Sequence, residues 1–599
     1  MVEYMIKTTV EEKDTYYFAR EYYRLRKGDE RIYLLDFSRT MEQAFDPETG
    51  DIANNKIVLG IRDKVVTMAE STDGSRLAFV SAGRLFSYNS EENKMAYIFG
   101  FYDRENMEDR RETYRSNDIK IFRVDDDGNI YFCVYGYMSG GIHEGDLGAA
   151  VYYYDTARNT IEELMFLPYA ATYDLLCLEM DKLSYANAAG ECFFVLNNTV
   201  YQINTVTGTR KILAESVPLG GIRMSGKGQM AVWVEGEDLY HARSLMMLEL
   251  SSGNLMTLDC EPGERILPIG YFDEDIVYGI ANAADVSEDE SGHTFFPMKR
   301  ICIRTIKGEV LKTYEEPDVY ITQAVMNDRM ITLKRVRREE GEWIEIGDDQ
   351  IMNNSLSVSE KNTVATAVTD KYETLVQLEL RSDIDTKSMQ LLAPLLLLPE
   401  ENRTVEIATD ITTAYYYVYE EGILKAEYLY AYEAVQRAYE TGAPAVAADG
   451  RTIYRKTTRQ TKNQIMAIKG DLVAEDAENA SEKLACCLET ILKYEGVITS
   501  VKEDLASGKR ATEILEEYLD GADILNLSGC SVDMILYYVA QDIPVMALRE
   551  DGSAILIIGY NDTQLVIYDP AVSGVAKHSR SEIEKMLLPE GNRFITYIR

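Results

Sequence analysis

The chain has 599 residues, which corresponds to roughly three or four domains of ordinary size. Its 62 Lys and Arg are outnumbered by 100 Asp and Glu, and the net charge of -38 disfavours binding to phosphate backbones, so we expect no nucleic-acid partner. The 42 Tyr far exceed the 16 Phe and 2 Trp, and this excess favours β-strands because a tyrosine ring suits a half-buried pleated surface.

Cysteine and histidine are scarce. With 8 Cys in the chain and no pair at zinc-ligand spacing, the sequence predicts neither a disulfide framework nor a zinc site. Cys133, Cys192 and Cys302 lie within strand-like runs, where a thiol is typically a small buried hydrophobe. The 4 His are too far apart in sequence for a metal-binding helix of the H-E-x-x-H type. We therefore expect no metal and no cofactor.

The sequence offers no segment suited to a bilayer. Residues 1–20 carry charges every few positions and lack the apolar stretch of a signal peptide. The longest apolar run, residues 389–398, contains Pro394 and is too short to span a membrane. We expect no membrane span within this chain, while an anchor upstream of residue 1 would leave the same sequence.

From about residue 15 to 385, strand-like runs alternate with turn dipeptides. A polar turn carrying Asp, Asn or Gly precedes a strand rich in aromatic and β-branched residues. The turns lie at Asp73-Gly74, Asp127-Gly128, Ala189-Gly190, 226–228, 273–275 and Asn327-Asp328, with an earlier copy at Gly28-Asp29. Their spacing, roughly 40 to 60 residues, is the pitch of four-stranded propeller blades.

This arrangement resembles the irregular β-propellers of the TolB-like and related bacterial surface type. The resemblance implies a propeller of about seven blades over residues 1–385, with six or eight left open. The acidic run Asp125-Asp126-Asp127-Gly128-Asn129 also invites a calcium interpretation. Its glycine is out of register with an EF-hand loop, so an inter-strand turn is favoured over a calcium site.

Residues 386–455 predict a small α/β connector. A tyrosine-rich strand is followed by a helix over 430–441, which Gly442 ends, and by a second strand. From 456 to 599 the pattern is mixed α and β. We expect helices at 481–495, 512–519 and 531–539, followed by strands at 544–548, 554–560 and 563–570.

This C-terminal part resembles the papain-like cysteine peptidases of the bacteriocin-processing, double-glycine type. The matching frames are 482–496, Ile543-Pro544-Val545, 552–560 and Asp569-Pro570. The resemblance implies an α+β papain-like domain over 456–599. It places Lys483 at the family's nucleophilic Cys and Ser553 at its His, and it retains only Asp569. Thiolate and imidazole, which the mechanism needs, are both replaced, so we expect no catalytic residues.

Three alternatives keep a nucleophile. Cys487, one turn inside the first helix beside Cys486, shares an apolar face with neighbouring leucines. Cys530 stands at a helix start, but His578, the only His of this part, lies in an exposed strand or loop. A Ser553–Lys483 pair is the third alternative, because Ser–Lys pairs perform acyl transfer on other folds. A buried thiol and a solvated lysine are the favoured interpretations.

The sequence therefore predicts a multidomain, mainly β protein: a propeller (1–385), a connector (386–455) and an inactive papain-like domain (456–599). We expect a non-catalytic binding or scaffolding protein, bacterial and surface-associated, that recognises peptide, protein or glycan ligands. The alternatives are an active cysteine peptidase using Cys530 or Cys487, and a cytoplasmic scaffold.

Overall fold

A computed structural model gives the fold of the chain. It describes all residues except 11–12, 49–51, 64, 102–115, 219, 227, 289–292, 328–329, 340–341, 354–361, 370–373, 398–402, 408–414, 458, 471, 474–476, 478 and 573. The described residues form two compact units, one made of 1–280 with 299–412 and the other of 281–298 with 413–599. The predicted Asn327-Asp328 turn lies partly outside the described residues.

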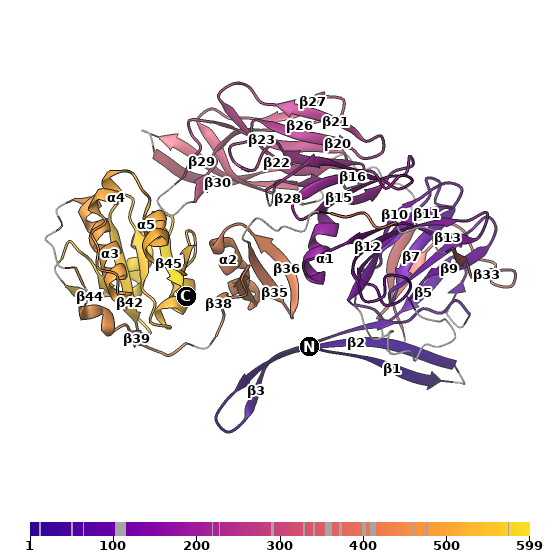
Figure 1. Cartoon of the computed structure of the whole chain (residues 1–599), viewed down its shortest axis with the longest axis horizontal. Coiled ribbons are helices and arrows are strands. Elements are labelled where there is room, and N and C mark those ends of the chain that lie inside the picture. Colours follow the sequence, from indigo (N-terminus) through magenta and orange to yellow (C-terminus); the bar gives the residue numbers. More distant parts are fainter. Residues whose placement is uncertain are drawn as a thin grey trace. The chain divides into compact units, whose positions relative to one another are not determined.

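The first unit is built from antiparallel sheets of consecutive strands (Figure 1). One sheet contains β6 (Met68–Glu70), β7 (Arg76–Ser81), β8 (Arg84–Asn89) and β9 (Lys94–Phe99). The next contains β10 (Asn117–Val124), β11 (Ile130–Tyr137), β12 (Leu147–Asp155) and β13 (Thr160–Pro168). Two further sheets contain β14 (Ser184–Ala186), β15 (Glu191–Leu196), β16 (Thr199–Asn204) and β17 (Arg210–Ala214), then β18 (Arg223–Met224), β19 (Met230–Val234), β20 (Ser244–Glu249) and β21 (Asn254–Asp259).

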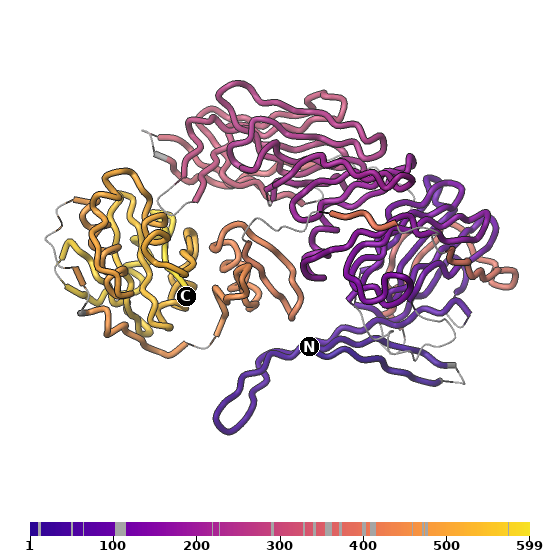
Figure 2. Tube along the Cα trace, viewed as in Figure 1, coloured from indigo at the N-terminus to yellow at the C-terminus, as the bar shows by residue number. Residues whose placement is uncertain are grey.

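One sheet joins strands from distant parts of the sequence. It contains β4 (Ile52–Ala53), β5 (Lys56–Gly60), β31 (Thr363–Val368) and β32 (Thr374–Glu379). β32 pairs antiparallel with β5, so the segment 363–379 completes a sheet that 52–60 begins (Figure 2). This pairing of early and late strands is the way in which a propeller ring would be closed.

Successive sheets of the first unit stack through shared hydrophobic cores, because alternate residues of each central strand point to opposite faces. In β15, Cys192 and Phe194 pack against the preceding sheet, while Phe193 and Val195 pack with Trp233 of the following one. Cys133, Cys192 and Cys302 are buried, as predicted. The described residues show this stack but no closed ring, so a closed seven-bladed propeller stays a prediction.

The last sheet of this unit differs from the expected separate blades. It contains seven strands: β22 (Glu264–Phe272), β23 (Asp275–Asn282), β26 (Met298–Arg304), β27 (Val310–Tyr314), β28 (Val319–Asn327), β29 (Met330–Glu339) and β30 (Glu342–Met352). β27 pairs only with residues 301–304 of β26. The remaining edge of β26 is therefore available to β28, which joins strands of two expected blades into one sheet.

The predicted blade turn at Gly28-Asp29 is wrong. It joins β2 (Lys13–Lys27) to β3 (Ile32–Gln43) in a separate sheet with β1 (Val2–Val10). β1 covers only residues 13–21 of β2, so the rest of β2 and β3 extends as a two-stranded hairpin (Figure 1). Its apolar side chains, such as Leu25 and Leu34, are exposed.

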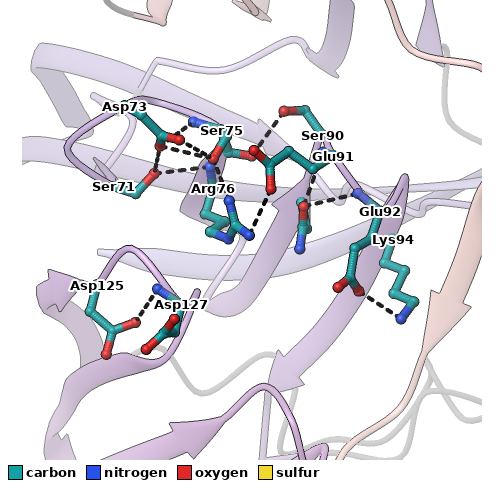
Figure 3. Close-up of polar contacts among 11 residues, drawn as sticks. Ser71, Asp73, Ser75, Arg76, Ser90, Glu91, Glu92, Lys94, Asp125 and Asp127 are labelled. Atoms are coloured by element: carbon teal, nitrogen blue, oxygen red, sulfur yellow. Dashed lines mark hydrogen bonds and ion pairs between the residues drawn. The ribbon is translucent and has the colours of Figure 1, made fainter.

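A four-residue turn recurs before the second strand of four sheets and confirms four of the predicted turns. It begins at Ser71, Asp125, Asn187 and Ser225, whose side-chain oxygens accept backbone N–H groups from four or five residues later at 2.8–3.1 Å. The glycine three residues on donates its N–H back to the first carbonyl and has a φ of +66 to +87°. Figure 3 shows the turns that begin at Ser71 and Asp125.

The second unit has one large antiparallel sheet. Its order is β40 (Asp523–Asn526), β45 (Phe594–Ile598), β41 (Val545–Leu548), β42 (Ala554–Tyr560), β43 (Gln564–Tyr568) and β44 (Val575–Ser579), with β39 (Asn463–Gln464) beside β42. The helices are α3 (Ala480–Tyr494), α4 (Lys502–Ala506), α5 (Ala511–Tyr518), α6 (Val532–Val539) and α7 (Arg580–Leu587). The three predicted helices correspond to α3, α5 and α6, and the predicted strands to β41, β42 and β43.

Two cores cover the two faces of this sheet. Leu556 and Ile558 of β42 pack in the core that contains α3 and α5, and Ile555 and Ile557 pack in the core that contains α6 and α7. All seven residues of β42 are buried, as expected for a strand covered on both sides. β42 is thus a rigid element on which side chains at either end can be positioned.

The predicted connector is divided between the two units. β33 (Gln390–Leu392) and β34 (Leu395–Leu397) pair in parallel with β9 and β13 of the first unit. The rest forms a sheet of β35 (Tyr416–Glu420), β36 (Ile423–Tyr428), β37 (Pro444–Ala447) and β38 (Thr452–Arg455) with α2 (Ala431–Thr441). Val435 of α2 shares a core with Ile535 of α6. The domain boundaries at 385 and 455 stay predictions.

Remaining elements are short. They are α1 (Tyr173–Lys182) in the first unit, and β24 (Ser287–Glu288) with β25 (Thr294–Phe295) in the second. Among the helices in the described part of the chain, none is both long enough and apolar enough to cross a bilayer.

Candidate functional site

The first part of the candidate site is the start of α3. The Asn479 side chain caps this helix by accepting the Glu482 N–H at 2.9 Å. Lys483 therefore lies in the first turn, half-buried, where the predicted alignment places a nucleophile. A helix N-terminus lowers the pKa of a thiol and so favours the nucleophilic thiolate, whereas a lysine ammonium has no lone pair with which to attack.

Ser553 lies in the tight turn between β41 and β42. Its hydroxyl donates to Asp551 Oδ1 at 2.6 Å and its backbone N–H donates to the same atom at 2.9 Å. These bonds, with smaller contributions from the charges of Arg549 and Lys483, hold the pKa of Asp551 below its ordinary value. Lys483 is thus within electrostatic range of this turn, and the start of α3 lies near the start of β42.

Asp569 follows β43 and is half-buried, with Oδ1 accepting the Ala571 N–H at 2.9 Å. Its charge is one of the causes that raise the pKa of Cys487, after burial and Cys486. Cys487 Sγ in turn donates to the Ala554 carbonyl at 3.3 Å, next to Ser553. The structure therefore brings together the three chain segments that carry Lys483, Ser553 and Asp569.

Sequence reasoning missed Asp551 as a member of this cluster. The residue is the hydrogen-bond partner of Ser553 and the carboxylate nearest to the expected base position. Its signal was present in the sequence, because Asp551-Gly552 is a turn dipeptide directly before Ser553, and Gly552 has a φ of +78°.

The alternative nucleophiles are buried in hydrophobic cores. Cys487 has no exposed surface, and burial raises the pKa of its thiol well above the ordinary value. Cys530 is also fully buried, its pKa is raised by burial, and its Sγ lies 3.8 Å from the Tyr432 carbonyl. A nucleophilic thiolate needs the opposite, a lowered pKa and access to substrate.

His578 lies on β44, opposite Leu565, and is exposed as predicted. Cys530 belongs to the same buried apolar core as Leu565. Among the hydrogen bonds of the described residues, none joins Cys530 to His578. The expected imidazole is therefore not positioned against a thiol by any described contact.

The acidic run at Asp125 forms a turn. Asp125 Oδ1 accepts the N–H groups of Asp127 and Asn129 at 3.1 and 2.8 Å, and Asp126 Oδ1 accepts the Thr72 N–H at 2.9 Å. These carboxylates are thus used by backbone donors, which favours the turn over the calcium site. Within the described residues, no group of three or more His, Cys, Asp or Glu is arranged to hold a metal ion.

Comparisons with known proteins give only distant likenesses. No protein-family model matches the chain, and no curated protein matches its sequence. A C39-like peptidase from Bacillus anthracis is similar at 16% identity, with 22% of this chain and 92% of that chain covered and a TM-score of 0.18.

Two TolB proteins are also similar to part of the chain. TolB from Agrobacterium tumefaciens shares 12% identity over 44% of this chain and 91% of its own, with a TM-score of 0.21. TolB from Acinetobacter baumannii shares 10% identity over 55% and 97%, with a TM-score of 0.16. At these identities and TM-scores no family membership follows.

Proposed function

We propose that the chain is a non-catalytic binding or scaffolding protein that carries a degenerate papain-like domain. The proposal is supported by the residues at the two aligned positions: a lysine lies in the first turn of α3 and a serine directly precedes β42, where the resemblance implies a thiol and an imidazole. Neither residue supplies the thiolate–imidazolium pair on which papain-like acyl transfer depends.

Ser553 is a poor substitute nucleophile for a physical reason. Its hydroxyl is engaged with Asp551, and a carboxylate whose pKa is held low is a weak proton acceptor. Among the hydrogen bonds of the described residues, none joins the Ser553 hydroxyl to Lys483. These observations support a Ser553 that stabilises its turn over a Ser–Lys catalytic pair.

The ligand class follows from the proposed architecture. Propeller faces and a peptidase-like groove without a nucleophile both suit recognition of peptides, proteins or glycans. An extracytoplasmic, surface-associated location belongs to the same proposal through the resemblance to bacterial surface propellers, and a cytoplasmic scaffold is its alternative. An active peptidase using Cys530 or Cys487 is disfavoured by the burial of both thiols.

The proposal predicts binding without turnover. The whole chain is applied to peptide and glycan arrays, and each captured ligand is recovered and weighed by mass spectrometry. We expect saturable binding of a ligand class that is recovered intact. Recovery of shortened ligands would contradict the non-catalytic assignment, and failure to bind any member of either array would contradict the ligand class.

A further inference from the structure

A pocket of the second unit lies at the end of β42 opposite to Ser553. Its cavity volume is about 360 Å³, at the lower end of the range of small-ligand sites. Tyr560, the last residue of β42, lines it, whereas Ser553 directly precedes the first residue of that strand. A strand of this length spans roughly 20 Å, so the pocket is separate from the peptidase-like positions.

Asp533 is the centre of an ion-pair network in the wall of this pocket. It accepts from Arg459 Nη2 at 2.6 Å and lies 3.2 Å from Arg580 Nη2, while Arg580 Nε donates to Glu584 at 2.7 Å. These bonds fix both guanidinium groups before a ligand arrives, which reduces the entropy lost on binding. Because carboxylates of the protein already balance the two guanidinium charges, an anionic ligand would have to compete with them.

The other charged residues of the wall do not single out an ionic ligand either. Lys456 is engaged with the protein, since its Nζ donates to the Tyr439 carbonyl at 3.0 Å and lies 4.4 Å from the centre of that ring. Arg455 and Asp562 carry opposite charges. The wall therefore offers both donors and acceptors, which suits a ligand whose hydroxyl groups can donate and accept.

Uncharged polar side chains line the same pocket. Gln460 and Thr461 are exposed on the segment between β38 and β39, and Asn561 follows β42. Among the described residues, no hydrogen bond involves the Gln460 side-chain amide or the Thr461 hydroxyl. An amide both donates and accepts, as the neighbouring hydroxyls of a sugar do, so these groups can bond to a polyhydroxylated ligand.

Tyrosine rings form the apolar part of the wall. Tyr439 and Tyr537 are half-buried, and the ring centroids of Tyr454 and Tyr537 lie 4.9 Å apart. Packing against a neighbour restricts the Tyr537 ring while leaving part of it in the pocket. Such a ring can cover the C–H face of a sugar, because a tyrosine combines a broad apolar face with a polar tip.

We propose that this pocket binds a small neutral saccharide. The Tyr537 ring contacts the C–H face of one sugar ring, and Gln460 and Thr461, together with the N–H groups that Arg459 and Arg580 do not spend on carboxylates, bond to its hydroxyls. The site lies outside the peptidase-like positions Lys483, Ser553 and Asp569. It therefore binds its ligand whether or not those positions are catalytic.

Saturation-transfer NMR of the whole chain with a panel of common neutral mono- and disaccharides tests this site, with benzoate and phenyl phosphate as anionic probes. We expect at least one saccharide to bind saturably in a following isothermal titration. Its Kd should change by less than about twofold when the salt concentration is raised, because no ionic bond to the ligand is screened. Failure of the whole panel to bind, or tighter binding by either anion, would overturn the proposal.

The exposed polar residues locate the binding. Gln460→Ala with Thr461→Ala should weaken the preferred saccharide about fivefold or more, because its hydroxyls lose hydrogen-bond partners. The matched control is Lys462→Ala, which alters an exposed residue of the same segment that does not line the pocket and should leave the affinity within about twofold. An equal loss in both chains would contradict the assignment to this pocket.

Two substitutions of Tyr537 test the ring contact. Tyr537→Ala should weaken saccharide binding about tenfold or more, and Tyr537→Phe, which keeps the ring, should restore it to within about threefold of the wild type. Equal losses in the two variants, each melting at the wild-type temperature, would count against stacking. If Tyr537→Ala does not fold, the comparison of the Gln460 and Thr461 variant with Lys462→Ala decides alone.

Discussion

At the residue scale, hydrogen bonds and burial set the pKa values of the side chains in the candidate site. Asp551 has a lowered pKa because the Ser553 hydroxyl and N–H bond to it, while the thiols of Cys487 and Cys530 have raised pKa values because they are buried. A low pKa makes Asp551 a poor proton acceptor, and a raised pKa keeps the two thiols protonated. Both effects disfavour catalysis. By the resemblance to papain-like peptidases, we propose that Lys483 and Ser553 occupy the positions where a thiol and an imidazole would meet.

Restoring these two residues tests that statement. In Lys483→Cys with Ser553→His, we expect the new thiol to have a pKa lower by about one unit or more than in Lys483→Cys alone, because an imidazolium stabilises the thiolate. The measurement is the pH dependence of iodoacetamide labelling at residue 483, resolved by peptide mass spectrometry. Equal thiol pKa values in the single and double variants would show that the two positions do not face each other.

Glu433 provides a pH-dependent contribution to stability. Burial raises its pKa from 4.5 to about 7, outweighing the hydrogen bond from the Tyr430 backbone. Between these values the folded chain holds a proton that the unfolded chain releases, so the free energy of unfolding falls as pH rises from about 4.5 to 7. The loss of stability from ionising Glu433 is absent below about pH 4.5 and complete above about pH 7.

Glu433→Gln should therefore stabilise α2 selectively at high pH. We expect the variant and the wild type to melt at the same temperature at pH 4. At pH 8 the free energy of unfolding of the variant should be higher by an amount on the order of 1 kcal/mol. Differential scanning calorimetry across this range measures the gap. A difference that does not change with pH would contradict a raised pKa at Glu433.

At the element scale, the recurring turn of the first unit depends on one left-handed glycine. Gly228 has a φ of +66°, and a Cβ there would meet nothing within 4 Å, so only backbone conformation disfavours another residue. Gly226 lies in the same turn, also in open space, with no such φ. The two glycines form a matched pair.

Gly228→Ala should lower the free energy of unfolding by about 1 kcal/mol. Gly226→Ala should leave it unchanged or raise it by up to about 1 kcal/mol, because alanine restricts the unfolded chain. Urea unfolding followed by circular dichroism compares the two variants. Equal effects would mean that the turn does not require the left-handed conformation.

Elements with strong local signals could be predicted from the sequence. α3, α5 and α6 follow from apolar periodicity with capping residues, and the four recurring turns follow from glycine turns before strand-like runs. The N-terminal sheet was missed because its Gly28 turn has the same composition as a blade turn. Composition does not reveal which sheet a strand joins, since pairing depends on contacts distant in sequence.

At the scale of the whole molecule, long-range pairing is what the sequence could not supply. The segments 363–379 and 390–397 pair with strands that precede residue 170, and no local pattern encodes those partners. The candidate site shows the same limit. Its motif positions could be aligned from sequence, but the Asp551 bond to Ser553 depends on the folded arrangement.

The central claim is that the chain binds without cleaving. The most direct measurement incubates micromolar chain with a mixed peptide library and follows the products by mass spectrometry, with and without iodoacetamide. The account predicts no cleavage beyond that of a chain-free control over many hours. Iodoacetamide-sensitive cleavage that is lost in Cys530→Ala or Cys487→Ala would contradict it, as would cleavage that is lost in Ser553→Ala.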